Sequence, residues 1–226
     1  MNAPLLASLL LVAATALAQT DKAVEITAEP HHHLAWQNEY FRAFKVEVAP
    51  GEATLLHIHH HDYVFVIIGP AEIVNEAQGK PPAKVHLEDG QTKYSAPTVH
   101  LVRNAGDAPF RNVAIEFLKD KEMKTSNPQD SNDEGTTKTL QNGTQKILFV
   151  RDGVRVSSVE LQPQGALTLD ERSHGQLLIA VSALQLKGKT STEKMKIEDL
   201  KWIDAGKKTL TNAGDHSGTF VMLEVL

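Results

Sequence analysis

The stretch of sequence that decides the fold is GEATLLHIHHHDYVFVIIG, residues 51–69. Five residues separate Gly51 from His57, and a single isoleucine separates His57 from His59. Side chains two residues apart on a β-strand point to the same face, so these two imidazoles lie together when the segment is extended. Two neighbouring imidazoles on one face are suited to bind a single metal ion.

A third ligand has to come from another strand, and His100 is the candidate. It opens a strand-like apolar run, three residues after Pro97 and four residues before Asn104. Three histidines and an acid leave open coordination positions for water or a substrate on Zn, Fe, Mn, Co or Ni. The sequence therefore predicts one site for a divalent transition-metal ion.

The chain after residue 18 reads as many short strands with turns between them. Alternating or β-branched apolar runs are separated by Gly, Pro, Asn and Asp, a pattern typical of an all-β sandwich or barrel. The clearest runs are residues 41–48, 63–68, 113–118 and 220–225. Residues 192–200 have only weak helical character.

The two halves of the chain resemble each other. The string Asn-Ala-Gly-Asp occurs at residues 104–107 and again at 212–215, each time before an apolar strand. Each half also opens with a strand followed by a proline, Pro50 and Pro163, at an offset of 113 residues. Such a repeat indicates a duplicated small β-domain. Because Asn, Gly and Asp are residues that favour turns, we expect Asn104 and Asn212 to have a structural role in a turn.

This arrangement resembles the cupin family, whose first motif holds a Gly, two histidines and an acid and whose second holds a Pro, a His and an Asn. The matching residues are Gly51, His57, His59, Gly69, Pro97, His100 and Asn104. With the repeat, the resemblance implies a bicupin, in which two double-stranded β-helix (jelly-roll) barrels follow one another. We assign residues 19–118 to an N-terminal metal-binding barrel, 119–145 to a polar linker or loop, and 146–226 to a degenerate C-terminal barrel.

The resemblance also implies an acidic fourth ligand, and here the acid is Asp62 rather than a glutamate. Its spacing to Gly69 fits the family, whereas its spacing to His59 is one residue short. His61 competes for the same role, because it continues the strand face of the first two histidines. With Asp62 preferred to His61, the predicted metal ligands are His57, His59, Asp62 and His100.

The second half does not repeat these ligands. Asp170 and Arg172 replace the histidines of the first motif, and Lys208 replaces His100. The second barrel is therefore expected to bind no metal, and three roles remain open for it: shaping the pocket, supporting a homodimer, or binding an anion. A separate run, His31–His33, follows no ligand spacing and is expected to be an exposed loop.

Residues 1–18 predict a secretory signal peptide, since they carry no charged side chain and end in Ala-Leu-Ala. The protein is therefore expected to be exported, to a periplasm or outside the cell, with no membrane segment after cleavage. It has no cysteine, so stability has to come from core packing or a bound metal rather than from disulfides. A net charge of −5 argues against a nucleic-acid surface.

Fold and metal do not fix a reaction. The resemblance implies a metal-dependent oxygenase, decarboxylase or isomerase that acts on a small molecule at one Fe, Mn, Zn, Ni or Co ion. The sequence identifies no catalytic residue. Two other classes stay open: a non-enzymatic periplasmic binder of a small molecule, and an interaction module whose metal site is structural or vestigial.

Overall fold

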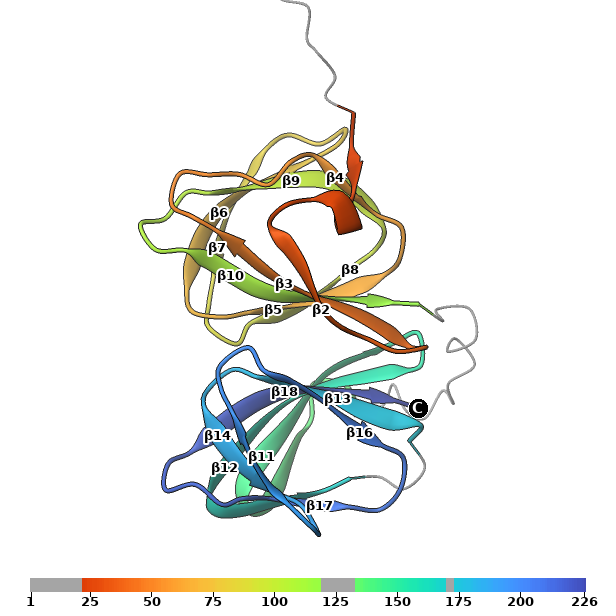
Figure 1. The fold of residues 1–226 in the computed structure, drawn as a ribbon, viewed down its shortest axis with the longest axis vertical. Coiled ribbons are helices and arrows are strands. Elements are labelled where there is room, and N and C mark those ends of the chain that lie inside the picture. Colours follow the sequence, from red (N-terminus) through yellow and green to blue (C-terminus); the bar gives the residue numbers. More distant parts are fainter. Residues whose placement is uncertain (1–21, 119–132, 170–172) are drawn as a thin grey trace, which may run out of the picture.

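The protein is described by a computed structural model over residues 22–118, 133–169 and 173–226. The described residues form β-strands and one short 3-10 turn, η1 (Ile26–Ala28). The strands build two barrels, which lie one above the other in Figure 1. The predicted all-β fold with two tandem barrels is confirmed. The predicted signal peptide lies outside the described residues, and none of those residues forms a helix long and apolar enough to cross a membrane.

Two five-stranded sheets form the first barrel, with strand orders β1-β4-β9-β6-β7 and β2-β3-β10-β5-β8. Its strands are β1 (Val24–Glu25), β2 (His32–Gln37), β3 (Phe41–Val48), β4 (His57–His59), β5 (Tyr63–Ile67), β6 (Ala71–Ala77), β7 (Ala83–Leu87), β8 (Thr92–Ser95), β9 (Thr98–Asn104) and β10 (Phe110–Phe117).

One eight-stranded sheet forms the second barrel, in the order β15-β14-β17-β12-β18-β13-β16, with β11 paired to β12. Its strands are β11 (Thr137–Arg151), β12 (Val154–Thr168), β13 (Gly175–Ala180), β14 (Leu184–Lys187), β15 (Thr192–Met195), β16 (Leu200–Asp204), β17 (Thr209–Asn212) and β18 (Gly218–Val225). Residues 192–200, which have weak helical character in the sequence, hold β15 and the start of β16 instead.

The barrels pack against each other through a shared apolar core. Strands β3, β5 and β10 of the first barrel face β13 and β18 of the second (Figure 1). Alternate residues of β10, such as Val113 and Ile115, point into this shared core and are fully buried. The other set of alternate residues, which includes Asn112 and Glu116, points into the first barrel, because side chains alternate along a strand. Most of β10 is therefore buried on both faces, with Asn112 and Glu116 directed toward the site and Arg111, on the other face, 3.5 Å from the Glu198 carboxylate of the second barrel.

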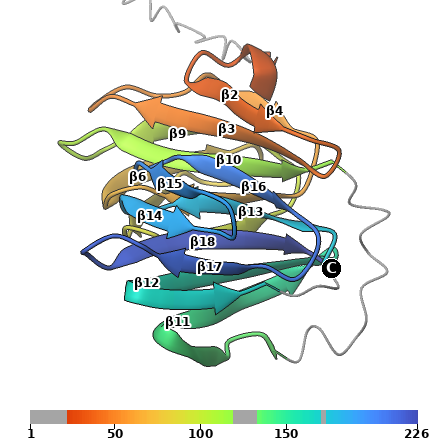
Figure 2. The ribbon, with the colours of Figure 1, turned by 60° about the horizontal axis from the view of Figure 1, so that its bottom comes forward.

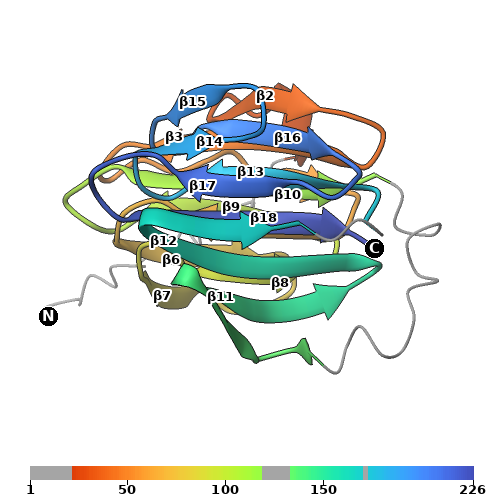
Figure 3. The same ribbon diagram turned by 90° about the horizontal axis from the view of Figure 1, so that it is seen from below.

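The structure differs from the predicted linker at residues 119–145. Residues 119–132 lie outside the described part, whereas residues 137–145 belong to β11, which runs along β12 in Figures 2 and 3. Backbone hydrogen bonds to β12 hold these residues, and most of their side chains are exposed. A half-exposed strand needs no apolar run, so the polar composition of residues 137–145 is compatible with a strand.

The predicted turn role of the repeated asparagines is confirmed. The Asn104 amide donates to the backbone oxygens of Val48 and Ala108, 2.9 and 2.8 Å away, and accepts from the Gly106 amide at 3.0 Å. In the second barrel, Asn212 makes the three equivalent bonds, at 2.9, 2.8 and 3.0 Å. The same side chain thus ties the same turn to the opening strand in both halves.

One glycine leaves room for the packing of the two barrels against each other. Gly175 begins β13 at φ 143°, and a Cβ there would collide with the indole of Trp202. That indole stacks on Trp36 of the first barrel, with ring centroids 5.6 Å apart. We expect Gly175→Ala to lower the free energy of unfolding by about 2 kcal/mol or more. Gly188→Ala is the matched control, since its Cβ meets nothing nearer than 3.9 Å. Equal denaturation midpoints for the two variants would contradict this account.

Candidate metal centre

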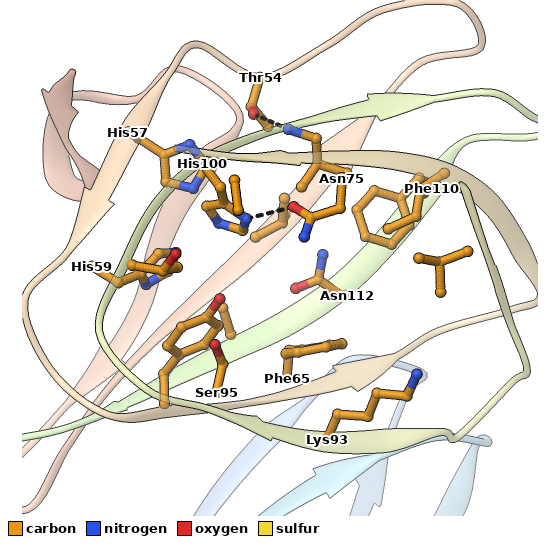
Figure 4. A pocket seen from close by; sticks show the side chains of 18 of the residues that line it. Thr54, His57, His59, Phe65, Asn75, Lys93, Ser95, His100, Phe110 and Asn112 are labelled. Atoms are coloured by element: carbon orange, nitrogen blue, oxygen red, sulfur yellow. Dashed lines mark hydrogen bonds between the residues drawn. The ribbon is translucent and has the colours of Figure 1, made fainter. Parts of the chain in front are cut away.

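The three predicted histidine ligands lie together inside the first barrel. His57 and His100 are direct cross-strand partners on β4 and β9, and His59 follows on the same face of β4. The ring centroids of His57 and His100 are 4.6 Å apart, and that of His59 lies 5.2 Å from His57 and 5.4 Å from His100. Figure 4 shows the three rings gathered at one end of a pocket. The structure therefore brings these three predicted site residues together.

A fourth histidine joins them from the other sheet. His32 begins β2, is 9% exposed, and has its ring centroid 4.6 Å from that of His57. One ligand atom from each of His32, His57 and His59 lies within 4.8 Å of the others, a spacing that could hold a metal ion. The expectation of an exposed loop at His31–His33 is therefore wrong for its central residue.

The predicted fourth ligand, Asp62, lies elsewhere. Among the described residues, no group with metal-binding spacing includes Asp62 or its competitor His61. The Asp62 carboxylate lies beside Tyr94, and burial together with this carboxylate raises the pKa of the Tyr94 hydroxyl. Tyr63, the next residue, stacks on His59 instead, with ring centroids 4.0 Å apart. Neighbouring residues of a strand face opposite sides, so Tyr63 occupies the position toward the histidines and Asp62 does not.

Each of the four histidines has its Nδ1 atom beside an acceptor. Nδ1 of His57 lies 2.9 Å from the Leu55 backbone oxygen, and Nδ1 of His100 lies 2.8 Å from Oδ1 of Asn75. With Nδ1 donating to these acceptors, the Nε2 atom keeps its lone pair for another partner. Nε2 of His57 is buried and has no hydrogen-bond partner.

Two buried carboxylates lie behind the other two rings, although only the His32–Glu29 contact has hydrogen-bond geometry. Nδ1 of His32 lies 2.5 Å from Oε2 of Glu29, and Nδ1 of His59 lies 3.3 Å from Oε1 of Glu116. Burial alone would raise the pKa of Glu29, but hydrogen bonds from His32, His31 and the Leu55 amide lower it to about 2. An acceptor behind a ligating imidazole is the usual way in which proteins orient it toward a metal.

The imidazoles of His57, His59 and His100 favour the neutral form, because the pKa of each is lowered. Burial, with the neighbouring histidines, lowers the pKa of His57 to about 4 and that of His100 to about 2. Burial also lowers the pKa of His59, although Glu116 acts in the opposite direction. A metal ion binds the neutral form of histidine, so these rings need to lose no proton before binding.

The second barrel keeps part of this architecture. Arg155 and Glu224 form a buried ion pair at 2.7 Å, at the repeat positions of Arg42 and Glu116, which pair at 2.6 Å. Asp170 and Arg172, predicted to replace two histidines, lie outside the described residues. Lys208 is exposed and donates to the backbone oxygen of Asp204 at 2.8 Å. This bond gives no support to an anion site at Lys208.

A cavity of about 340 Å³ lies beside the histidines in the first barrel. Its walls come from both sheets, and apolar side chains line the part away from the rings. A cavity of this size fits a small organic molecule.

Comparison with solved structures shows the fold. The chain is similar to oxalate decarboxylase of Lactobacillus farciminis in its formate complex, at 16% identity over 83% of this chain and 77% of that one, with a TM-score of 0.60. It is also similar to oxalate decarboxylase of Bacillus subtilis at pH 4.6, at 12% identity over 88% and 75% of the chains (TM-score 0.59). Procruciferin of Brassica napus, an 11S globulin, gives 8% identity over 83% of this chain and 76% of that one, with a TM-score of 0.61. No family model and no curated protein matches the sequence.

Proposed function

We infer the function from the site itself, because the solved structures and the strand arrangement show only an all-β jelly-roll cupin fold. At such identities the similarity extends to the fold alone. The neighbours include both a decarboxylase and a globulin, so the fold does not decide the chemistry.

We propose that this chain is an exported bicupin that holds one divalent transition-metal ion in its N-terminal barrel and binds or transforms a small molecule there. The observation that carries the proposal is the set of four histidines whose Nδ1 atoms lie beside acceptors. The metal-binding spacing of His32, His57 and His59 supports these three as ligands, and His32 takes the place that the sequence assigned to Asp62. His100 lies outside that group, and its ring, 4.6 Å from that of His57 and 5.4 Å from that of His59, supports it as the fourth ligand.

The donor set fits such an ion. Imidazole nitrogens suit Fe, Mn, Co, Ni and Zn, and the buried Nε2 of His57 without a partner is a group that a metal would satisfy. A bound ion would supply Lewis acidity and, for a redox metal, electron transfer. The protein's own part is to hold the rings through Glu29, Glu116, Asn75 and the Leu55 backbone, and to enclose the ligand in the cavity.

Whether the site is catalytic decides between an enzyme and a binder. We propose a metal-dependent oxygenase, decarboxylase or isomerase first, with a non-enzymatic binder or an interaction module as the alternatives. The test is to load the protein, purified without a histidine tag, with Fe, Mn, Co, Ni or Zn in turn and to measure oxygen uptake and carbon dioxide release. Oxalate is included, because two solved neighbours are oxalate decarboxylases. Tight metal binding without turnover of any compound in a broad screen would favour the binder.

Asn75 is expected to orient His100 for metal binding. Its Oδ1 is 2.8 Å from Nδ1 of His100, so Asn75→Ala frees the ring to rotate and change tautomer. Loss of such an outer hydrogen bond typically weakens metal binding about 10–100-fold. Competition with a chromophoric chelator measures the affinity. Asn38→Ala is the control, because its side chain binds only the backbone of a distant turn (the Tyr40 and Phe41 amides). Equal affinities would refute the positioning role.

Export and a metal-free second barrel complete the proposal. Amino-terminal sequencing of the mature protein and cell fractionation test cleavage after Ala18. Metal analysis of the isolated protein tests the second barrel, for which one ion per chain is expected. Light scattering tests whether the barrels form a homodimer. We assign no role in binding nucleic acid or membranes.

A further inference from the structure

A side-chain amide without a hydrogen-bond partner among the described residues lies inside the cavity. Asn112 lies on β10, is 7% exposed, and lines the cavity. No hydrogen bond within the described part of the chain involves its side-chain amide, and Figure 4 shows that amide directed into the space between His59, Asn75 and Phe110. Burying an amide without a partner costs free energy, so this position is one that a ligand would satisfy.

A second amide faces it from the other sheet. Asn75 lies on β6, and its Oδ1 is engaged by Nδ1 of His100 at 2.8 Å. This bond leaves the Nδ2 group of Asn75 to donate into the cavity. Figure 4 places both amides between the histidine rings and the Phe110 side chain. Together they offer donors for an oxygen atom of a ligand at the boundary between the polar and the apolar part of the cavity.

Much of the cavity wall is apolar. Its apolar side chains include those of Phe65, Ile73, Val85, Leu87, Val102 and Phe110, and Figure 4 shows Phe110 on the side of the two amides away from the histidines. Ile73 and Leu87 are buried at 8% and 1% exposure and belong to the core of the first barrel. A wholly polar ligand would leave this wall in contact with water, whereas an apolar body would cover it.

We propose that this cavity binds an organic molecule with an apolar body about the size of one ring and an oxygen-bearing head group. The amides of Asn75 and Asn112 bind the head beside the histidines, and the apolar wall around Phe110 encloses the body. The inference deepens the proposed function and rests on it, because the head lies next to the proposed metal ligands. A metal held by neutral imidazoles keeps its positive charge, so an anionic head such as a carboxylate is favoured.

Titration calorimetry on the zinc-loaded full chain tests this with benzoate and acetate, which share a carboxylate and differ in the ring. We expect benzoate to bind at least about tenfold more tightly than acetate, from burial of the ring. Asn112→Leu, which keeps the branched shape and removes the amide, should weaken benzoate binding about tenfold or more. Lys93→Met is the control, since Lys93 also lines the cavity and would attract any anion. It should change the affinity less than about threefold.

The possible results distinguish a failure of the proposed metal site from a failure of the proposed ligand contacts. Zinc content is measured before any probe is added, so a chain that takes up no zinc overturns the proposed function itself. A zinc-loaded chain that binds benzoate no better than acetate overturns the apolar body. Unchanged benzoate affinity in Asn112→Leu, or its loss in Lys93→Met instead, overturns the amide contact. Thermal unfolding checks that each variant is folded, and Asn112→Ala replaces the leucine variant if that one is not.

Discussion

Replacing His57 by alanine is expected to abolish stable metal binding. His57 is at the centre of the histidine group, with both His32 and His100 at ring-centroid distances of 4.6 Å, and its Nε2 has no other partner. Removing a ligand should cost more than the roughly 10–100-fold that removal of an outer hydrogen-bond partner costs. Metal content after dialysis against a weak chelator, measured by mass spectrometry, should fall to background.

Two neighbours provide the controls for this variant. His61→Ala removes a half-buried histidine of the same segment, and Asp62→Ala removes the acid that the sequence favoured. Neither belongs to a group with metal-binding spacing, so both variants should keep the ion. Loss of the metal from Asp62→Ala, with His57→Ala retaining it, would restore the assignment made from the sequence.

Replacing Arg42 by methionine is expected to have the largest effect on stability. Its guanidinium lies 2.6 Å and 3.0 Å from Oε2 of Glu116, a carboxylate whose side chain is fully buried. The substitution would leave the buried Glu116 carboxylate, beside His59, without its cationic partner. Removing one partner of a buried pair typically costs about 3–5 kcal/mol of the free energy of unfolding. Urea denaturation of the metal-free protein measures the loss.

A surface pair supplies the matched control. Arg103 and Glu76 lie 3.9 Å apart and are both accessible to solvent, so Arg103→Met should cost no more than about 1 kcal/mol. The double variant Arg42→Met with Glu116→Gln should recover part of the stability, since no buried charge then lacks its partner. A loss in Arg42→Met as small as in Arg103→Met would show that the buried pair has no special role.

The sequence predicted the fold and the grouping of His57, His59 and His100, largely because the signals are local. The His-x-His spacing needs only the alternation of a strand, and the repeated Asn-Ala-Gly-Asp string contains its own turn. His100 followed from the second motif of the resemblance. Its pairing with His57 across β4 and β9 agrees with that assignment.

The fourth ligand could not be predicted in the same way. His32 meets His57 only because β2 pairs with β3 in the opposite sheet, a contact that no spacing rule contains. Asp62 fits the spacing to Gly69, but a shift of one residue along a strand sends a side chain to the other face, and spacing alone does not reveal such a shift. The stacked pair of Tyr63 and His59 marks where the inward position lies.

Anomalous diffraction from a crystal of the metal-loaded protein, recorded at the absorption edge of the bound metal, locates the ion directly. We expect one strong peak per chain, enclosed by the imidazoles of His32, His57, His59 and His100. A peak coordinated by Asp62, a peak in the second barrel, or no peak among these histidines would contradict this assignment.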